Sequence, residues 1–168
     1  SNTVAVEGGV LGHTLHAIVG HVQQPLKGEG ILSANCEIYN WQELNEKYNF
    51  NAQNDADLLL KLLDTFGTTK LEELDGVFAF AYFKYNKVTV ARDILGVKPL
   101  WYVYTTDGFA FASEKKALEK VGYVDIQELN PRSVLTYDVD TKKLETTQRP
   151  FFEYVPEHTE DYKILKQK

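Results

Sequence analysis

The stretch VFAFAYF, at residues 77–83, contains no charged residue on either face of an extended chain. Successive residues of a strand point to opposite faces, so Phe78, Phe80 and Tyr82 share one face and the other four residues share the second. An antiparallel strand with one face in water alternates apolar and polar residues. The lack of alternation predicts a strand covered on both sides, by a helix layer or by a second sheet.

Two amphipathic helices are predicted upstream of this stretch. The first covers residues 41–48, with Asn40 as its expected N-cap and Glu43 as its capping-box partner. The second runs from Asp55 to Phe66, because its leucines fall on one stripe of a 3.6-residue period. Hairpins are expected over 77–91, 100–112 and 133–147. The local pattern alone indicates an α+β chain.

The composition is that of one globular domain of 168 residues, with 43% hydrophobic residues. The single Cys excludes an internal disulfide framework and a Cys-based zinc site, and the histidines lack metal-ligand spacing. No apolar run is long enough for a membrane span, and no signal peptide opens the sequence. The net charge of −6 disfavours nucleic acid as a partner. We expect no membrane or nucleic-acid partner, no metal and a cytoplasmic location.

Four phrases with a characteristic order occupy the middle of the chain. They are Asn35-Cys36-Glu37-Ile38-Tyr39-Asn40, Asn54-Asp55-Ala56-Asp57, Gly76-Val77-Phe78-Ala79-Phe80-Ala81, and Arg92-Asp93-Ile94-Leu95-Gly96-Val97-Lys98-Pro99-Leu100 with Phe111-Ala112-Ser113-Glu114-Lys115-Lys116-Ala117-Leu118 behind it. In this respect the chain resembles the glutaminase domain of the class II glutamine amidotransferases, and most of all the glutamine-hydrolysing asparagine synthetases. The resemblance extends from about Val10 to Leu135, and several ordered motifs are far more specific than one.

This resemblance implies a four-layer αββα sandwich of the Ntn-hydrolase type, with two stacked, mainly antiparallel sheets. It implies that an N-terminal Cys thiolate attacks the side-chain amide of glutamine and that ammonia passes to a synthetase domain. Glutamine or a similar free amino acid is therefore the expected ligand, and a synthetase domain or a second copy of the chain is the expected partner. No cofactor is expected in this domain, because ATP and Mg would belong to the absent synthetase domain.

The resemblance also implies roles for individual residues. Asn35 matches the side-chain donor of the oxyanion hole, and Cys36 stands where the family has the glycine that supplies the backbone donor. The substrate-binding positions are matched by Ile18, Val19, Glu37 and Asp55. Asp55 would receive the α-ammonium group of the substrate, although a carboxylate at a helix N-terminus explains it equally well.

The start of the chain departs from the family pattern. The family begins with the nucleophilic Cys, a strand and an Arg-Gly-Pro-Asp phrase, whereas only ten residues precede Leu11 here. We expect the first strand and the nucleophile to be missing, and Ser1-Asn2 to be a tag remnant. The amidotransferase-like domain is expected to cover residues 1–150, and residues 151–168 to form a tail or linker.

Two internal positions also depart from the pattern. Leu15 replaces an Arg that would hold the substrate carboxylate, and Cys36 replaces a Gly. Ser1 at a free amino terminus or a displaced Cys36 are conceivable substitutes for the nucleophile, but a tag remnant and a buried, inert thiol are the simpler interpretations. Arg92 and Asp93 are expected to form a structural ion pair.

Two functional hypotheses remain open on the sequence. The first is the glutaminase half of an ATP-dependent amide synthetase, present here as a fragment without its nucleophile. The second is a degenerate, non-catalytic module, a pseudoenzyme that keeps the fold for binding or oligomerisation. In either case we expect the chain as given to show no glutamine turnover.

Overall fold

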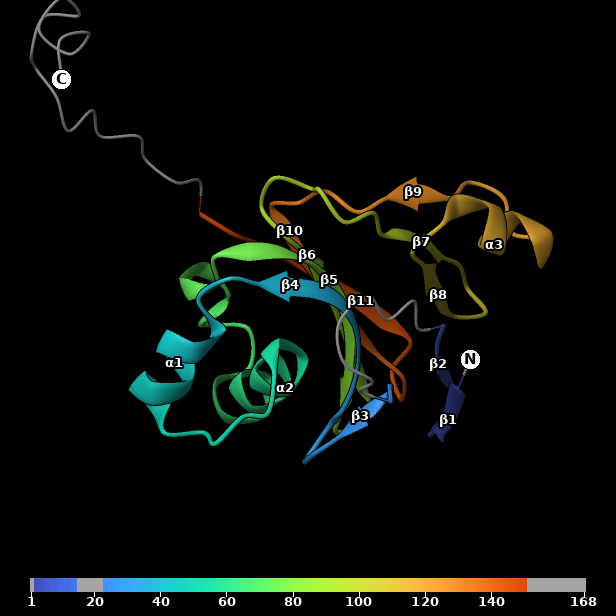
Figure 1. The fold of residues 1–168 in the computed structure, drawn as a ribbon. Helices are drawn as coiled ribbons and strands as arrows, with labels where there is room; N and C mark the ends of the chain where they lie inside the picture. Colours follow the sequence, from blue (N-terminus) through green and yellow to red (C-terminus); the bar gives the residue numbers. More distant parts are fainter. Residues whose placement is uncertain (1, 15–22, 151–168) are drawn as a thin grey trace, which may run out of the picture.

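Residues 2–14 and 23–150 are described by a computed structural model (Figure 1). In chain order the elements are β1 (Asn2–Val6), β2 (Gly9–His13), β3 (Leu26–Lys27), β4 (Ile31–Ile38), α1 (Trp41–Tyr48), α2 (Asp55–Phe66), the 3-10 turn η1 (Leu71–Glu73), β5 (Gly76–Lys84), β6 (Lys87–Arg92), β7 (Trp101–Tyr104), β8 (Phe109–Ala112), α3 (Lys115–Lys120), β9 (Gln127–Glu128), β10 (Ser133–Asp138) and β11 (Lys143–Gln148). Both predicted helices are confirmed at their predicted bounds. The division between a domain at 1–150 and a tail at 151–168 stays a prediction.

The largest sheet has six strands in the order β11-β10-β6-β5-β4-β3, and all neighbours are antiparallel. β5 is paired with β4 on one side and with β6 on the other. Its register places Phe78 opposite Cys36 and Ala79 opposite Asn35. Tyr85 and Asn86 join β5 to β6 with φ values of 51° and 55°, which a tight two-residue hairpin requires and which Asn tolerates.

The two faces of β5 are buried against different layers, as the VFAFAYF pattern predicts. Phe78, Phe80 and Tyr82 belong to the apolar cluster that α1 and α2 complete. Ala79 and Ala81 belong to a second cluster on the opposite face. Figure 1 shows α1 and α2 on one side of the six-stranded sheet, with β1, β2, β7 and β8 on the other.

The second strand layer consists, within the described residues, of two ladders. One is the β1–β2 hairpin and the other has the order β8-β7-β9, with α3 packed on β7 and β8. Leu11 from β2 and Phe109 from β8 pack with Ala81 and Val90 of the large sheet. The predicted α+β sandwich of stacked antiparallel sheets with helices outside them is confirmed.

The loop that follows β6 is fixed by Asp93, which is 2% exposed. Its Oδ1 accepts a hydrogen bond from the Val97 N–H (2.9 Å), and its Oδ2 accepts from the N–H groups of Lys98 (3.0 Å) and Phe78 (3.3 Å). A buried backbone donor without a partner is costly, so this one carboxylate stabilises both the loop and the start of β5.

The predicted ion pair between Arg92 and Asp93 is wrong, although both residues do have structural contacts. Arg92 points to Glu128 in β9 of the second strand layer, with 2.7 Å between Nη1 and Oε1, and also donates to the carbonyl groups of Leu129 and Gly96. Adjacent residues at a strand end point in different directions, which separates the two charged groups.

The N-terminal residues belong to the fold. Asn2 is the first residue of β1 and pairs with His13, and its Nδ2 donates to the Gln24 carbonyl (3.3 Å). Asn2 therefore takes part in the β1–β2 hairpin, and its assignment to a tag remnant stays a prediction. Ser1 lies outside the described residues.

Asn40 does not cap α1 with its side chain, so the predicted capping box is also wrong. Its Nδ2 donates to the Glu73 carbonyl (2.8 Å), and its Oδ1 accepts from the Asp75 N–H (3.0 Å). The amide thus ties the end of β4 to the segment around η1, a long-range partner that competes with the local cap.

No helix in the described ranges has the length and apolarity that a bilayer crossing needs.

Candidate functional site

The candidate site is built around the N-terminus of α2, where the backbone enters the helix at Asn54. Asn54 is extended (φ −164°), and its Oδ1 accepts from the Asp57 N–H (2.9 Å). Asp57 in turn accepts from the Gln53 N–H (2.9 Å) and pairs with Lys61 (2.6 Å). These reciprocal bonds satisfy donors of the first helical turn and fix where Asp55 begins the helix.

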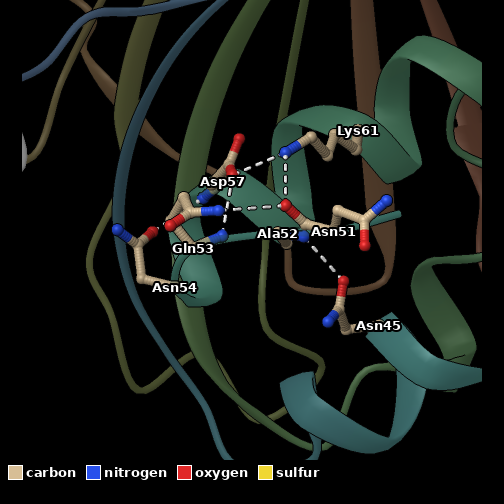
Figure 2. Close-up of polar contacts among 7 residues, drawn as sticks. All are labelled: Asn45, Asn51, Ala52, Gln53, Asn54, Asp57 and Lys61. Atoms are coloured by element: carbon tan, nitrogen blue, oxygen red, sulfur yellow. Dashed lines mark hydrogen bonds and ion pairs between the residues drawn. The ribbon is translucent and has the colours of Figure 1, made fainter. Parts of the chain in front are cut away.

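The segment between α1 and α2 is held from both helices (Figure 2). The Asn45 side chain of α1 accepts from the Ala52 N–H (2.7 Å), while Lys61 of α2 and the Gln53 amide both donate to the Asn51 carbonyl (3.3 Å each). The result is a connection with few free backbone groups, so the helix start is set with respect to the large sheet.

Asp55 itself bonds to the outer edge of β4. Its Oδ2 accepts from the Ile38 N–H (3.2 Å), and its Oδ1 accepts from the Ala56 N–H (2.8 Å). A carboxylate at a helix N-terminus is favoured by the helix dipole. These contacts fit the structural interpretation of Asp55, and they place the carboxylate beside the strand that carries the oxyanion-hole candidates.

The edge of β4 presents a row of outward N–H groups at alternate residues. Ala34 is covered by Gln24, whose Oε1 accepts from its N–H (2.7 Å) and whose Nε2 donates to its carbonyl (2.8 Å). Ile38 is covered by Asp55. Cys36 lies midway between these two residues, so its N–H points out of the same edge. This is the orientation that a backbone oxyanion donor needs.

The thiol of Cys36 lies on the helix side of the sheet, packed against the α1 and α2 cluster. Burial raises the pKa of Cys36 well above its ordinary value, and the charge of Asp55 and a hydrogen bond to it raise the pKa further. Glu37 adds a smaller increase and Lys98 acts in the opposite direction. A thiol in this setting stays protonated near neutral pH, which argues against Cys36 as a displaced nucleophile.

The reactivity of Cys36 tests this electrostatic picture. We expect the thiol to react with a disulfide reagent at pH 8 at least about a hundredfold more slowly than a free thiol, because the thiolate is the attacking species. Asp55→Asn removes the adjacent charge, lowers the thiol pKa and should speed the reaction severalfold. Asp107→Asn, in the exposed turn between β7 and β8, is the control, and equal rates in the two variants would contradict the assignment.

The remaining described candidates lie on the other face of β4. Asn35 is exposed, and its strand neighbour Glu37 has a side chain that is 63% exposed and lies 3.6 Å from Lys98. The structure thus brings Cys36 and Asp55 into contact and places Asn35 and Glu37 on the opposite face. The roles of these four residues stay predictions. Ile18 and Val19, like the substituted position Leu15, lie outside the described residues.

Two residues next to these positions were missed by sequence reasoning. Gln24 is 7% exposed, and its side-chain amide bonds to both backbone groups of Ala34, which lies ten residues later in the sequence. Lys98 lies beside Glu37. Lys98 falls inside a family-like phrase, but a phrase match does not reveal which side chains bond across strands.

The described residues contain no group of three His, Cys, Asp or Glu side chains able to hold a metal ion. His13 forms a hydrogen bond with Ser33, with 3.1 Å between Nδ1 and Oγ. Burial of the ring lowers the pKa of His13. The expectation that this domain uses no cofactor stays a prediction.

Known proteins give a consistent picture of the lineage. The sequence matches the family model of a glutamine amidotransferase domain over residues 1–160. It is 35% identical over 133 residues to the glutamine-hydrolyzing asparagine synthetase B of Escherichia coli (strain K12), a match that covers 72% of this chain and 24% of that protein. It is 33% identical over 130 residues to the glutamine-hydrolyzing asparagine synthetase 1 of Bacillus subtilis (strain 168), covering 73% of this chain and 18% of that protein.

The chain thus spans less than a quarter of the length of either of these two relatives. Among solved structures, the glutamine phosphoribosylpyrophosphate amidotransferase of B. subtilis superposes with a TM-score of 0.72 at 23% identity, over 83% of this chain and 34% of that one. At this identity the superposition establishes a shared fold, in agreement with the layered sheets described above.

Proposed function

The chain belongs to the glutamine amidotransferase domain family and is related to the asparagine synthetases; from this premise we propose that it is a glutaminase domain that binds glutamine and releases ammonia for amide synthesis in an ATP-dependent synthetase domain. The observation that carries the proposal is the edge of β4. There the Asp55 carboxylate at the start of α2 accepts from the Ile38 N–H, two residues along β4 from Cys36, and acts electrostatically on the Cys36 thiol.

In this proposal glutamine lies along the open edge of β4. The Asp55 carboxylate receives its α-ammonium group from the helix side of the sheet. The side-chain amide then reaches Asn35, whose Nδ2 and the Cys36 N–H would donate to the oxyanion that forms when a nucleophile attacks. Two donors held on one strand need no rearrangement as charge develops, which is the basis of oxyanion stabilisation. Charge pairing at Asp55 would orient the substrate for that attack.

Glutamate release from glutamine by the full-length polypeptide that contains this domain tests the activity. We expect turnover that a thiol-blocking reagent abolishes, because the family chemistry uses a thiolate. Asn35→Ala should lower the turnover by about a hundredfold, as loss of one oxyanion donor does elsewhere, with little change in KM. Asn130→Ala serves as the control amide variant away from β4. Absence of thiol-dependent turnover would contradict the proposal.

A second candidate function follows from the Cys36 side chain. Its thiol interacts electrostatically with the same carboxylate that would otherwise receive the substrate ammonium group. In this interpretation the domain is a degenerate module in which Cys36 occupies part of the pocket and Leu15 no longer binds the substrate carboxylate. The fold would then serve binding or oligomerisation without glutamine hydrolysis.

Glutamine binding by the present chain separates the two interpretations. We expect Cys36→Gly to tighten binding at least about tenfold, or about 1.4 kcal/mol, because it frees Asp55. Adding Leu15→Arg should tighten it further through a bidentate pair with the carboxylate. Cys36→Ala also frees Asp55 but keeps a Cβ, so comparing it with Cys36→Gly separates the effect of the thiol from the effect of side-chain bulk. Calorimetry that shows no binding by the folded double variant would favour the degenerate module.

A further inference from the structure

The outer edge of β4 changes its partner along the strand. Leu32 pairs with Leu26, the residue at which β3 begins. The same antiparallel register places Gln24, two residues before Leu26, opposite Ala34, two residues after Leu32. Gln24 meets Ala34 with its side chain rather than with its backbone. A side-chain amide therefore stands where the next residue of a paired strand would be.

The Gln24 amide makes both hydrogen bonds that a paired strand residue would make. Its Oε1 accepts from the Ala34 N–H (2.7 Å), and its Nε2 donates to the Ala34 carbonyl (2.8 Å). Gln24 is 7% exposed, so water competes little for these groups. Its own carbonyl instead accepts from the Nδ2 of Asn2 in β1 (3.3 Å). The main chain of Gln24 thus bonds to the second strand layer while its side chain closes the β4 edge.

The next outward position on β4 is Cys36, which lies between two such side chains. Gln24 covers Ala34 on one side, and on the other the Asp55 carboxylate accepts from the Ile38 N–H (3.2 Å). Within residues 2–14 and 23–150, the backbone N–H and carbonyl of Cys36 have no hydrogen-bond partner. Gln24 and Asp55 therefore leave a gap one residue wide, and the outward N–H of Cys36 lies in it.

We propose that Gln24 is a positioning residue for the glutaminase reaction, an inference that rests on the proposed function. By bonding to Ala34, its amide fixes the β4 backbone so that the Cys36 N–H keeps the direction that an oxyanion needs. A donor stabilises an oxyanion best when it is fixed before charge develops, and small displacements of such groups slow the reaction. Gln24 itself does not touch the substrate in this arrangement. Asp55 is held by α2, so the affinity for the substrate should depend little on Gln24.

Steady-state kinetics on the full-length polypeptide that contains this domain test the assignment. Gln24→Leu keeps a similar side-chain size but neither hydrogen bond. We expect it to lower kcat for glutamate release at least about tenfold and to change KM by less than about twofold, the pattern of an interaction lost only in the transition state. Gln127→Leu is the matched control, because it removes an exposed amide of β9 that accepts from the Tyr102 hydroxyl (2.7 Å). It should keep wild-type kinetics, and an equal loss of kcat in both variants would contradict the proposal.

Gln24→Glu adds a readout that a general loss of stability does not give. Its ionised carboxylate can accept from the Ala34 N–H but has no hydrogen to donate to the Ala34 carbonyl, whereas the protonated acid can do both. We expect kcat of this variant, relative to the wild type at the same pH, to rise as the pH falls from about 8 to about 5. The relative kcat of Gln24→Leu should stay constant. A reduced kcat ratio for Gln24→Glu that does not change with pH would contradict the proposal.

Backbone ¹⁵N relaxation by NMR on the 168-residue chain tests the positioning step without any turnover. We expect the Cys36 N–H to have an order parameter of about 0.85 in the wild type and in Gln127→Leu, and to fall toward about 0.6 in Gln24→Leu. The N–H of Val90, in the centre of the large sheet, should stay rigid in all three proteins and so report that the sheet is folded.

The two measurements separate this inference from the proposed function. An unchanged order parameter of Cys36 in Gln24→Leu would overturn the role of Gln24, even if wild-type turnover is found. A full-length wild type that releases no glutamate would instead contradict the proposed function. Loss of order at Cys36 in Gln24→Leu would then still support Gln24 as the residue that holds this backbone donor in place.

Discussion

Asp93→Ala is expected to lower the free energy of unfolding by about 3–6 kcal/mol. Three backbone N–H groups, those of Phe78, Val97 and Lys98, lose their acceptor at once. Each buried donor left without a partner costs about 1–3 kcal/mol. The site is buried, so water cannot replace the carboxylate without opening the junction between β5 and the loop after β6.

Urea unfolding followed by circular dichroism measures this loss. Asp93→Asn keeps one amide oxygen as an acceptor and should fall between the wild type and the alanine variant. Asp107→Ala, in the exposed turn between β7 and β8, is the control and should change stability by less than about 0.5 kcal/mol. If the two alanine variants unfold at the same urea concentration, Asp93 does not stabilise the junction.

Gly76→Ala is expected to cost about 3 kcal/mol, through a steric clash. A Cβ at this position would lie 2.3 Å from the Glu37 carbonyl oxygen and 2.8 Å from the Cα of Ile38. Both atoms belong to the backbone of β4, which is held by its pairing with β5 along eight residues. Backbone cannot rotate away as a side chain can, so the strands must separate at the end that carries Cys36.

Gly9→Ala provides the matched control for this substitution. Gly9 also lies in a strand, β2, but a Cβ there would meet no atom within 4 Å. The free energy of unfolding of the Gly9→Ala variant should differ from that of the wild type by less than about 0.5 kcal/mol in thermal or urea unfolding. A Gly76→Ala variant as stable as Gly9→Ala would show that the β4–β5 pair relaxes without cost.

The architecture could be predicted where the sequence pattern is local and periodic. The apolar run of β5 indicated two covered faces, and both faces are buried in separate clusters. The leucine stripe of α2 gave its bounds, because Asn54 and Gly67 mark a helix start and stop that need no tertiary partner. The apolar pattern of β5 and the start and stop signals of α2 depend only on neighbouring residues, and no tertiary contact overrides them.

Contacts between distant residues were not predictable in the same way. Asn40 bonds to residues more than thirty positions away instead of capping the adjacent helix, and Arg92 pairs with Glu128 instead of its neighbour. In each case a long-range partner competes with the local one. Periodicity and capping rules describe only the local partner.

The candidate site shows the same division. The motifs named Asn35, Cys36 and Asp55, but only the structure shows that the thiol of Cys36 and the Asp55 carboxylate meet on one face while Asn35 lies on the other. The replacement of glycine by cysteine was visible in the sequence. Its effect on the pKa of the thiol depends on burial and on α2, which a one-dimensional pattern does not contain.

The register of the large sheet has a consequence for the order of folding. The β5–β6 hairpin closes through a two-residue turn, whereas β4 meets β5 only after about forty intervening residues, with Ile38 opposite Gly76. Closing a longer loop costs more chain entropy, and distant pairings slow folding. We therefore expect the hairpin to form early in kinetic experiments and the strand that bears Asn35 and Cys36 to join it later.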